Sequence, residues 1–148
     1  MQIKNKNVIQ FDAGHLNIGI VVARFNQDIT DELLKFALET LETSRVKRNN
    51  IRIIPVAGSV EIPYALQKLA GMKKYDCLVA LGCIIRGETP HFDYVCKMAQ
   101  EGVLRVSLDY KIPVGFGVLT VENIDQARDR YHVGGEAALA AVELALIN

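Results

Sequence analysis

The chain has 148 residues, of which 50% are hydrophobic and 23% are charged, a composition typical of a globular protein with a core of its own. Its 17 Lys and Arg residues balance its 17 Asp and Glu residues, and no basic run stands out, which argues against nucleic acid and against a membrane surface as partners. We expect one domain over residues 1–148.

Short β-branched runs alternate with amphipathic segments along the chain. The runs predict strands at residues 17–23, 51–57, 77–83 and 113–120. The amphipathic segments predict helices at 29–45, 63–72, 90–108 and 136–147, and a shorter helix after residue 123. Residues 8–10 are a candidate for a short extra strand, in this chain's sheet or on a neighbouring chain.

Individual residues refine these boundaries. Pro55 indicates an edge strand or a bulge. Thr89 and Pro90 are typical of an N-cap and a first helical residue, and Asn123 with Gln126 has capping-box spacing. Gly134 and Gly135 are expected to separate the short helix from the last one.

The order β-α-β-α-β-α-β-α predicts a parallel sheet with helices on both faces. Right-handed crossovers make this a three-layer α/β/α sandwich with a central four-stranded parallel sheet, flavodoxin-like in general architecture. Ligands of such sheets bind at the carboxyl ends of the strands. The segments RFN, GSVE, CIIRGETPH and TVEN follow the four predicted strands, so we expect their side chains to share one edge.

Two of these segments suggest contacts with a ring ligand, and each also has an ordinary interpretation. Phe25 is either a platform for a ring or a loop aromatic folded over the core. The Gly58–Ser59 pair either offers backbone groups to a ligand or makes a common strand-to-helix turn. Glu61 either accepts hydrogen bonds from hydroxyl groups or favours a helix N-terminus through its charge.

The segment RGETPH combines an anion site with a candidate base. Gly87, Glu88 and Thr89 precede a helix start, where unpaired N–H groups and the helix dipole attract a phosphate. His91 would lie in the first helical turn, where a neutral imidazole can accept and return protons. A surface or capping histidine is the alternative, and Arg130 is by itself most simply a solvated basic helix end.

The ends of the chain and its cysteines bear on where the protein works. The first residues, MQIKNKNVIQFDAG, have no apolar stretch like that of a signal peptide, and no apolar run is long enough to span a membrane. The three cysteines form no CxxC pair and leave an odd count, so we expect neither a metal site nor a disulfide. Cys77 and Cys83 should be small core residues. These features predict a reducing, cytoplasmic setting.

Several motifs together resemble those of the 6,7-dimethyl-8-ribityllumazine synthase family. The segments ARFN, GSVEIP, ALGCIIRGETPHFDYV, PVGFGVLT, QARDR and GGEAALAAVELA follow the family order and cover nearly the whole chain. The resemblance implies a transferase of riboflavin biosynthesis that condenses 5-amino-6-(D-ribitylamino)uracil with 3,4-dihydroxy-2-butanone 4-phosphate. It implies no metal and no organic cofactor.

The resemblance also implies roles for individual residues and an assembly. Pyrimidine and ribityl contacts are implied for Phe25, Ser59, Val60, Glu61, Cys83, Ile84, Ile85 and Phe116. Phosphate binding is implied for Glu88, Thr89 and Arg130, and proton transfer for His91. Phe116 and Arg130 correspond to residues that reach a neighbouring subunit's site, because the family forms homo-pentamers, in many members twelve of them in a shell of sixty subunits.

One segment departs from the family pattern. Family members commonly read NKGxEAA before the final helix, whereas this chain reads RYHVGGEAA, so Val133 or the shortened loop stands where the lysine is expected. His132 is a candidate replacement when it is protonated. The alternative functions are a non-catalytic binder of flavin-like rings, which would not need His91 beside a phosphate site, and a receiver module, which would need an Asp after the third strand.

Overall fold

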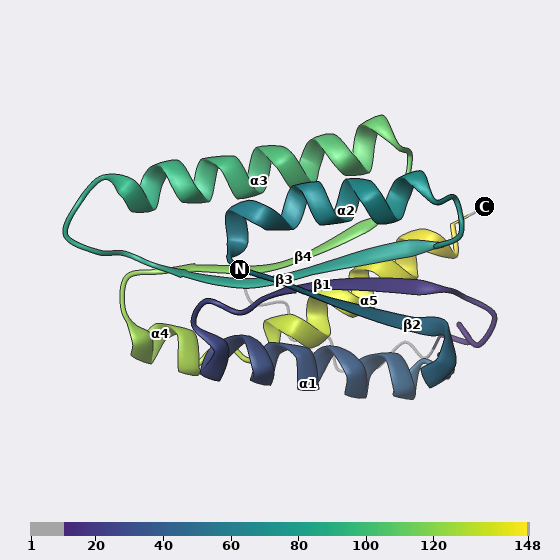
Figure 1. Ribbon diagram of the computed structural model, residues 1–148. Coiled ribbons are helices and arrows are strands. Elements are labelled where there is room, and N and C mark those ends of the chain that lie inside the picture. Colours follow the sequence, from purple (N-terminus) through teal and green to yellow (C-terminus); the bar gives the residue numbers. More distant parts are fainter. Residues whose placement is uncertain (1–10, 148) are drawn as a thin grey trace.

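Four parallel strands form the centre of the protein, and helices cover both faces of the sheet (Figure 1). The structure, a computed structural model, describes residues 11–147. The strand order is β2-β1-β3-β4, with β1 (Ile18–Ala23), β2 (Ile51–Val56), β3 (Cys77–Ile85) and β4 (Val114–Val121). One face carries α1 (Gln27–Thr43) and α5 (Val133–Ala145), and the other carries α2 (Ile62–Gly71) and α3 (His91–Asp109). The short helix α4 (Ile124–Arg128) follows β4. The predicted three-layer sandwich is confirmed.

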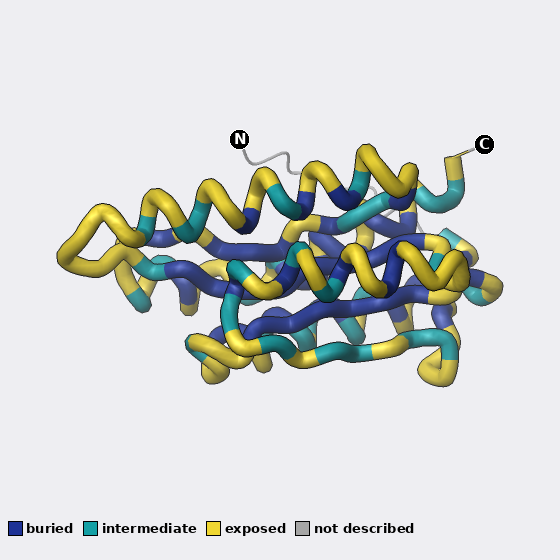
Figure 2. The backbone as a smooth tube through the Cα atoms, turned by 45° about the horizontal axis from the view of Figure 1, so that its top comes forward, coloured by how far each residue is buried: buried dark blue, intermediate teal, exposed yellow. Residues whose placement is uncertain are grey.

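Alternate residues of each strand enter two separate cores, one on each face of the sheet. On β1, Ile20 and Val22 face α1 and α5, whereas Val21 and Ala23 face α2 and α3. All residues of β1 are buried, because the strand lies between two others and beneath helices on both faces. Figure 2 shows the inner strands in dark blue between helices whose outer sides are yellow, and the edge strand β2 in teal and yellow. Each fully buried large apolar side chain contributes about 1.5–3 kcal/mol.

The position of β2 in the sheet agrees with the prediction from the sequence, whereas the length of β3 does not. Strand β2 is an edge strand, so Pro55, which lacks an N–H, is tolerated there as predicted. Strand β3 is longer than predicted, because its residues up to Ile85 pair with β4. Ile84 therefore lies inside the strand, as Cys83 does, and not in the loop that follows it, and the two residues are only 7% and 2% exposed.

The start of α5 corrects a second prediction. Gly134 and Gly135 do not separate two helices but lie in the first turn of α5, which begins at Val133. A Cβ at Gly134 would collide with the backbone of Leu33, and one at Gly135 would come within 2.7 Å of Thr40 Oγ1. The two glycines thus allow α5 to pack directly on the backbone of α1, a tertiary reason that local sequence does not reveal.

Three further predictions concern two helix starts and one candidate strand. Asn123 caps α4, because the Gln126 N–H donates to Asn123 Oδ1 at 2.9 Å, but the return bond of the predicted capping box differs, since Gln126 Oε1 accepts from the Glu122 N–H. Helix α3 begins at His91, one residue later than predicted, and Thr89 Oγ1 accepts a long hydrogen bond of 3.4 Å from the His91 N–H. The candidate strand at residues 8–10 lies outside the described residues.

Candidate active site

The carboxyl ends of β1 and β3 meet where the strand order reverses. From β1 the chain passes to the edge strand β2 and then crosses back over β1 to β3. The loops that follow β1 and β3 therefore lead to opposite faces of the sheet, and we call the place between them the crevice, because ligands of open parallel sheets bind at such a reversal of strand order. Because all strands are parallel, the segments after them share one edge, as the sequence predicts.

Asn26 joins the two sides of this crevice. Its side-chain Nδ2 donates to the carbonyl oxygen of Cys83 at 2.9 Å. The backbone of Asn26 is left-handed, with φ at 59°, a conformation that asparagine adopts more readily than most residues, and α1 begins at the next residue. No role of Asn26 was predicted from the sequence, in which an asparagine between a strand and a helix is the only signal for one.

Phe25 projects from the same turn and does not fold over the core. The residue is 71% exposed, while its backbone N–H is fixed by the Ala57 carbonyl at 3.0 Å. This hydrogen bond joins the turns that follow β1 and β2. A Cβ at Gly58 would lie 3.9 Å from Phe25 Cβ and 3.2 Å from Glu61 Oε2. Phe25 and Glu61 thus flank one turn, with an open aromatic face and an exposed carboxylate.

The turn that contains Ser59, Val60 and Glu61 sits against β3. These residues form a short 3-10 helix, and Ser59 is buried, with 7% of its surface exposed. A Cβ at Gly82 of β3 would lie 2.5 Å from Ser59 Oγ. Because glycine has no side chain, the turn can pack directly against β3 at this position. The half-buried Val60 and the exposed Glu61 are thereby held at the strand ends.

Strand β3 leaves backbone groups free beside the crevice. Its pairing with β1 stops at Leu81, whereas its pairing with β4 continues to Ile85. Backbone groups alternate between the two neighbours of a strand, and the Arg86 N–H donates on the β4 side. The backbone groups of Cys83 and Ile85 therefore face the β1 side. Asn26 occupies the Cys83 carbonyl, and the Ile85 backbone extends past the end of β1.

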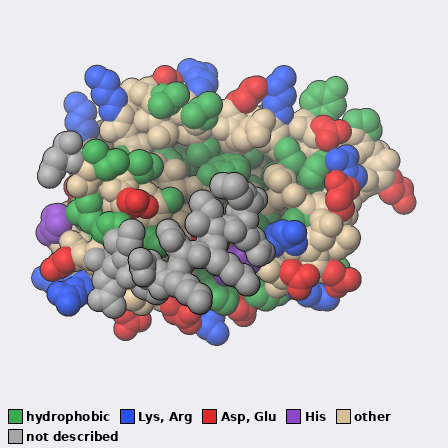
Figure 3. Space-filling view, turned by 180° about the vertical axis from the view of Figure 1, so that it is seen from behind, with side chains coloured by type: hydrophobic (Ala, Val, Ile, Leu, Met, Phe, Trp, Pro, Cys, Tyr) green, Lys and Arg blue, Asp and Glu red, His purple; other side chains and the backbone are tan. Residues whose placement is uncertain are grey.

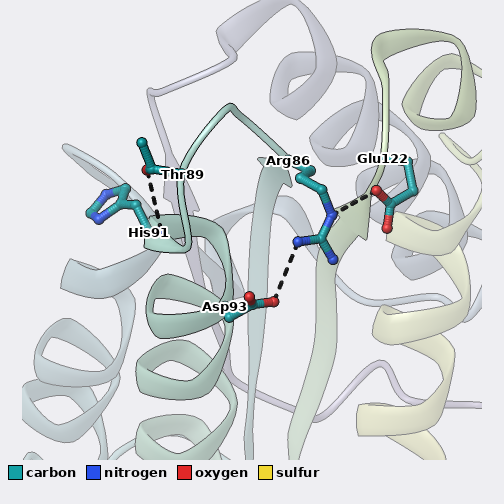
Figure 4. Close-up of polar contacts among 5 residues, drawn as sticks. All are labelled: Arg86, Thr89, His91, Asp93 and Glu122. Atoms are coloured by element: carbon teal, nitrogen blue, oxygen red, sulfur yellow. Dashed lines mark hydrogen bonds and ion pairs between the residues drawn. The ribbon is translucent and has the colours of Figure 1, made fainter.

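The loop after β3 leads into the N-terminus of α3. Gly87, Glu88, Thr89 and His91 are all exposed, and a Cβ at Gly87 would meet nothing within 4 Å. Helix α3 has 19 residues, so its N-terminal N–H groups and dipole make this loop suited to an anion. Figure 4 shows the His91 imidazole beside Thr89, on the outer side of the helix start.

Arg86 lies on the other side of the α3 start and was missed by the sequence analysis. Its Nε lies 2.7 Å from Glu122 Oε2, and its Nη1 lies 3.5 Å from Asp93 Oδ1 (Figure 4). The hydrogen bond to Glu122 and its charge, assisted by Asp93, raise the pKa of Arg86 above its ordinary value. Arg86 and Glu122 are 36 residues apart, so no local pattern could have predicted the pair.

Phe116 and Arg130 are not brought to this crevice. Phe116 pairs with Ala80 in the middle of β4, five residues before Val121, which is about 16 Å at the usual rise of a strand. Arg130 follows α4 on the face of the sheet that carries α1 and α5, and its Nη1 donates to the Gln126 carbonyl at 2.8 Å. His91 begins α3 on the opposite face.

The crevice is open to solvent in the single chain. Phe25, Glu88, Thr89 and His91 all have exposed side chains. A groove of about 700 Å³ lies elsewhere, along α1 and the start of β2, and contains none of these residues. Binding sites for small molecules are usually concave and cover most of the ligand, so this edge needs a further surface to enclose a substrate.

The predicted burial of two cysteines is confirmed. Burial raises the pKa of the Cys77 thiol to about 12 and, together with the charge of Asp28, that of the Cys83 thiol to about 11. Both thiols are therefore protonated near neutral pH and unsuited to nucleophilic attack. Among residues 11–147 no three His, Cys, Asp or Glu side chains gather as metal ligands would. In the same part of the chain, no helix combines the length and apolar character needed to cross a bilayer.

The position of the expected family lysine belongs to α5. Val133 is the first residue of this helix and packs against the core formed with α1. His132 precedes it, and its Nε2 lies 3.9 Å from Glu136 Oε1. This part of the chain therefore has an apolar side chain at the position aligned with the lysine, and an imidazole one residue earlier that is paired with a carboxylate.

Comparison with known proteins is consistent with this arrangement of motifs. A sequence profile described as 6,7-dimethyl-8-ribityllumazine synthase matches residues 15–148. A protein of Parabacteroides distasonis named 6,7-dimethyl-8-ribityllumazine synthase is 44% identical over 138 residues. That alignment covers 90% of this chain and 86% of the relative. The profile match over residues 15–148 includes all four strands and every residue of the crevice described above.

Proposed function

The chain belongs to the 6,7-dimethyl-8-ribityllumazine synthase family, and from this premise we propose that the crevice between β1 and β3 is where it carries out the family's reaction. The reaction condenses 5-amino-6-(D-ribitylamino)uracil with 3,4-dihydroxy-2-butanone 4-phosphate to 6,7-dimethyl-8-ribityllumazine. It releases phosphate and water, is the penultimate step of riboflavin biosynthesis, and makes the chain a transferase.

The pyrimidine is proposed to lie between the ends of β1 and β3. The exposed ring of Phe25 offers a stacking face, and Glu61 offers a carboxylate for ribityl hydroxyls. Because Cys83 and Ile84 have buried side chains, β3 contributes backbone groups, of which those at Ile85 lie beyond the end of β1. Ser59 and Val60 complete this side through the turn seated on Gly82.

The phosphate of the second substrate is proposed to bind at the loop before α3. The N–H groups of Glu88 and Thr89 and the Thr89 hydroxyl are placed before the positive end of a long helix. This arrangement, with His91 in the first turn, is the observation that supports the proposal most strongly. A ring-binding protein without catalysis has no need of a phosphate site next to an imidazole.

The chemistry follows from these placements. The 5-amino group attacks the ketone and forms an imine with loss of one water. Phosphate leaves to give an enol, and the second amine closes the ring with loss of another water. His91 takes up and returns the protons of these steps, an effect worth about 10²–10⁴-fold for general acid–base catalysis. Holding two reactive substrates together supplies a further large share of the acceleration.

The site is proposed to be completed by a neighbouring subunit of a homo-pentamer. Phe116 and Arg130 lie away from the crevice of their own chain, so they are available to another chain. Exposed apolar residues of α3 gather on about one third of its circumference, at 100° per residue, namely Tyr94, Met98, Leu104 and Leu108. From behind, hydrophobic side chains are visible along the top of the molecule and across its middle, between charged ones (Figure 3). Such surfaces suit contacts between subunits.

Two broader expectations accompany this proposal. We propose that residues 1–148 form one domain, since both cores of the described residues share one sheet. We also propose a cytoplasmic location and a reaction that needs no cofactor.

The direct test of the function is to mix both substrates with the protein and to follow lumazine absorbance. The wild-type protein should form product, and a correctly assembled His91→Ala variant should form it much more slowly while binding the pyrimidine normally. If the wild-type protein binds the pyrimidine but yields no product above the uncatalysed rate, the chain is a binder and the proposed function is wrong.

A further inference from the structure

We propose that Arg86 and Glu122 act together as positioning residues that hold the phosphate loop and His91 in place. This inference rests on the function proposed above and adds residues that do not touch the substrates. Arg86 contacts Glu122 through Nε at 2.7 Å and Asp93 through Nη1 at 3.5 Å. One guanidinium thus connects the end of β4 to the first turn of α3. We call these three residues the Arg86 clamp.

The guanidinium of the clamp, whose side chain is 40% exposed, also has an aromatic ring against one face. Its central carbon lies 4.4 Å from the centroid of the Phe92 ring, and Phe92 packs against the core beneath α2 and α3. The backbone N–H of Arg86 donates to the Val121 carbonyl at 2.9 Å. Both ends of the residue are therefore held, so that the side chain has little freedom to swing toward the loop.

Glu122 is also held in place by its neighbours. Its backbone N–H donates to Gln126 Oε1 at 2.7 Å, and Gln126 is itself fixed by Asn123, which accepts its N–H. The residue whose carboxylate orients Arg86 is thus itself held by hydrogen bonds, as the supporting residues of a preorganised site should be. The hydrogen bonds after the end of β4 therefore hold Glu122 in place, and Glu122 in turn holds Arg86.

The clamp closes the loop that carries the proposed phosphate site. The chain leaves the sheet after Ile85 and enters α3 at His91, and the contact between the side chains of Arg86 and Asp93 brings the two ends of this segment together (Figure 4). Inside the segment, the hydrogen bond from the His91 N–H to Thr89 is long, at 3.4 Å. The Asp93 N–H also donates to the Pro90 carbonyl at 3.0 Å, but both bonds lie within the segment, so the side chains that connect it to the end of β4 are those of the clamp.

An arginine beside a phosphate loop could instead be a phosphate ligand, but the geometry favours positioning. Two carboxylates already share the charge of Arg86, and the three side chains together carry a net charge of −1. In Figure 4 the guanidinium is turned toward Glu122 and Asp93, while Thr89 and His91 lie on the other side of the helix start. A phosphate that approached Arg86 would meet both carboxylates.

Steady-state kinetics of two variants separate the two roles. Glu122→Gln and Arg86→Met should each lower kcat by about 10- to 100-fold, since small displacements of reacting groups have effects of this size. The KM for the butanone phosphate should change less than about threefold, and the double variant should be no slower than Arg86→Met. Arg86→Lys, which keeps the charge, should recover part of the loss in kcat.

The opposite result identifies a phosphate ligand. In that case Arg86→Met raises the KM for the butanone phosphate, and Glu122→Gln lowers it because the arginine is released. A wild-type kcat in Glu122→Gln would equally overturn the positioning role. The control is Arg45→Met. It removes a surface ion pair in which Arg45 Nη1 lies 3.6 Å from Asp12 Oδ2, beyond the C-terminal end of α1, and it should leave kcat and KM unchanged.

Amide hydrogen exchange tests the clamp without relying on activity. Exchange of the hydrogen-bonded amides in the first turn of α3, such as the Asp93 N–H that donates to the Pro90 carbonyl at 3.0 Å, should become faster in Glu122→Gln and in Arg86→Met, but not in Arg45→Met. Unchanged exchange would refute the positioning role. If the wild-type protein forms no lumazine while exchange changes as expected, the proposed function fails and the clamp stands.

Discussion

The side-chain amide of Asn26 donates a hydrogen bond of 2.9 Å to the Cys83 carbonyl oxygen. This bond connects the turn after β1 to β3 at the point where β3 has lost β1 as a pairing partner. It fixes the distance between the proposed stacking face at Phe25 and the free backbone at Ile85. The width of the crevice therefore depends on one side chain with a left-handed backbone.

Replacing Asn26 with Asp should weaken this connection. The carboxylate cannot donate, and it repels the carbonyl oxygen that loses its partner, so the free energy of unfolding should fall by about 1–3 kcal/mol. Pyrimidine affinity should fall as well, because the crevice is no longer held. Urea unfolding and pyrimidine titration measure the two effects. Asn49→Asp, at an exposed site on the opposite edge, is the control, and equal stability of the two variants would contradict this role.

Phe25→Ala should affect binding far more than stability. The ring is 71% exposed, so its loss removes little buried surface, whereas stacking on a base is worth about 1–3 kcal/mol. We therefore expect weaker pyrimidine binding with a melting temperature close to that of the wild type. Calorimetric titration and thermal unfolding of the same sample check this. A large fall in melting temperature with unchanged affinity would show that Phe25 has a structural role instead.

Gly82→Ala should disturb the pyrimidine side of the crevice. The new Cβ would lie 2.5 Å from Ser59 Oγ and 3.2 Å from Ile62 Cδ1, so the turn that holds Ser59 to Glu61 must move. We expect a loss of about 1–3 kcal/mol of stability, as for other overpacked cores, together with weaker pyrimidine binding. Chemical unfolding and pyrimidine titration measure both.

Gly87→Ala provides the matched comparison. The same methyl group meets no atom within 4 Å at Gly87, so stability should be unchanged. If phosphate binds at this loop, the methyl group should hinder it and raise the KM for the butanone phosphate. A variant that is as stable as the wild type and uses the butanone phosphate equally well would contradict a phosphate site at this loop.

The three thiols should differ in reactivity and in their dependence on pH. With the pKa of Cys83 raised to about 11, about one thiol in a thousand is ionised at pH 8, and Cys77 is less ionised still. Cys96, which is only half-buried, should react first with a thiol reagent in the native protein. Equally fast native labelling of Cys83 and Cys96, followed by mass spectrometry, would contradict this order.

The same raised pKa values predict the effect of alkaline pH on stability. Below the ordinary thiol pKa of 9.0 both the folded and the unfolded chain are protonated, so these groups have no effect. Above it the unfolded chain loses protons first, and the free energy of unfolding should fall as pH rises from about 9 toward 11. Cys83→Ala should reduce this slope.

The sequence predicted the element order and the location of the crevice because both follow from local patterns. β-branched runs identified the strands, and the parallel arrangement then placed RFN, GSVE and RGETPH at one edge. Predictions of where a helix begins or a strand ends failed where tertiary contacts determine these bounds. Gly134 is helical because it lies against the backbone of Leu33, and β3 reaches Ile85 because β4 pairs with it.

The polar connections of the crevice could not have been predicted in the same way. Asn26 and Cys83 are 57 residues apart, and Arg86 and Glu122 are 36 apart, so their contacts depend on how strands and loops are arranged in three dimensions. The family resemblance assigned roles to residues that touch the substrates. The resemblance assigned no role to Asn26, Arg86 or Glu122, which hold the substrate-contacting residues in place.

The shared site is the central claim, and mixing two inactive variants tests it most directly. His91→Ala and Arg130→Ala chains are refolded together in equal amounts, and lumazine formation is measured in pentamers verified to contain both. A site is rebuilt where a chain with intact His91 receives Arg130 from its neighbour, which random mixing produces at about one quarter of the sites. The account predicts up to about this fraction of wild-type activity in the mixture, with little in either pure variant. Mixed pentamers that remain as inactive as their parents would show that Arg130 does not serve a neighbouring site.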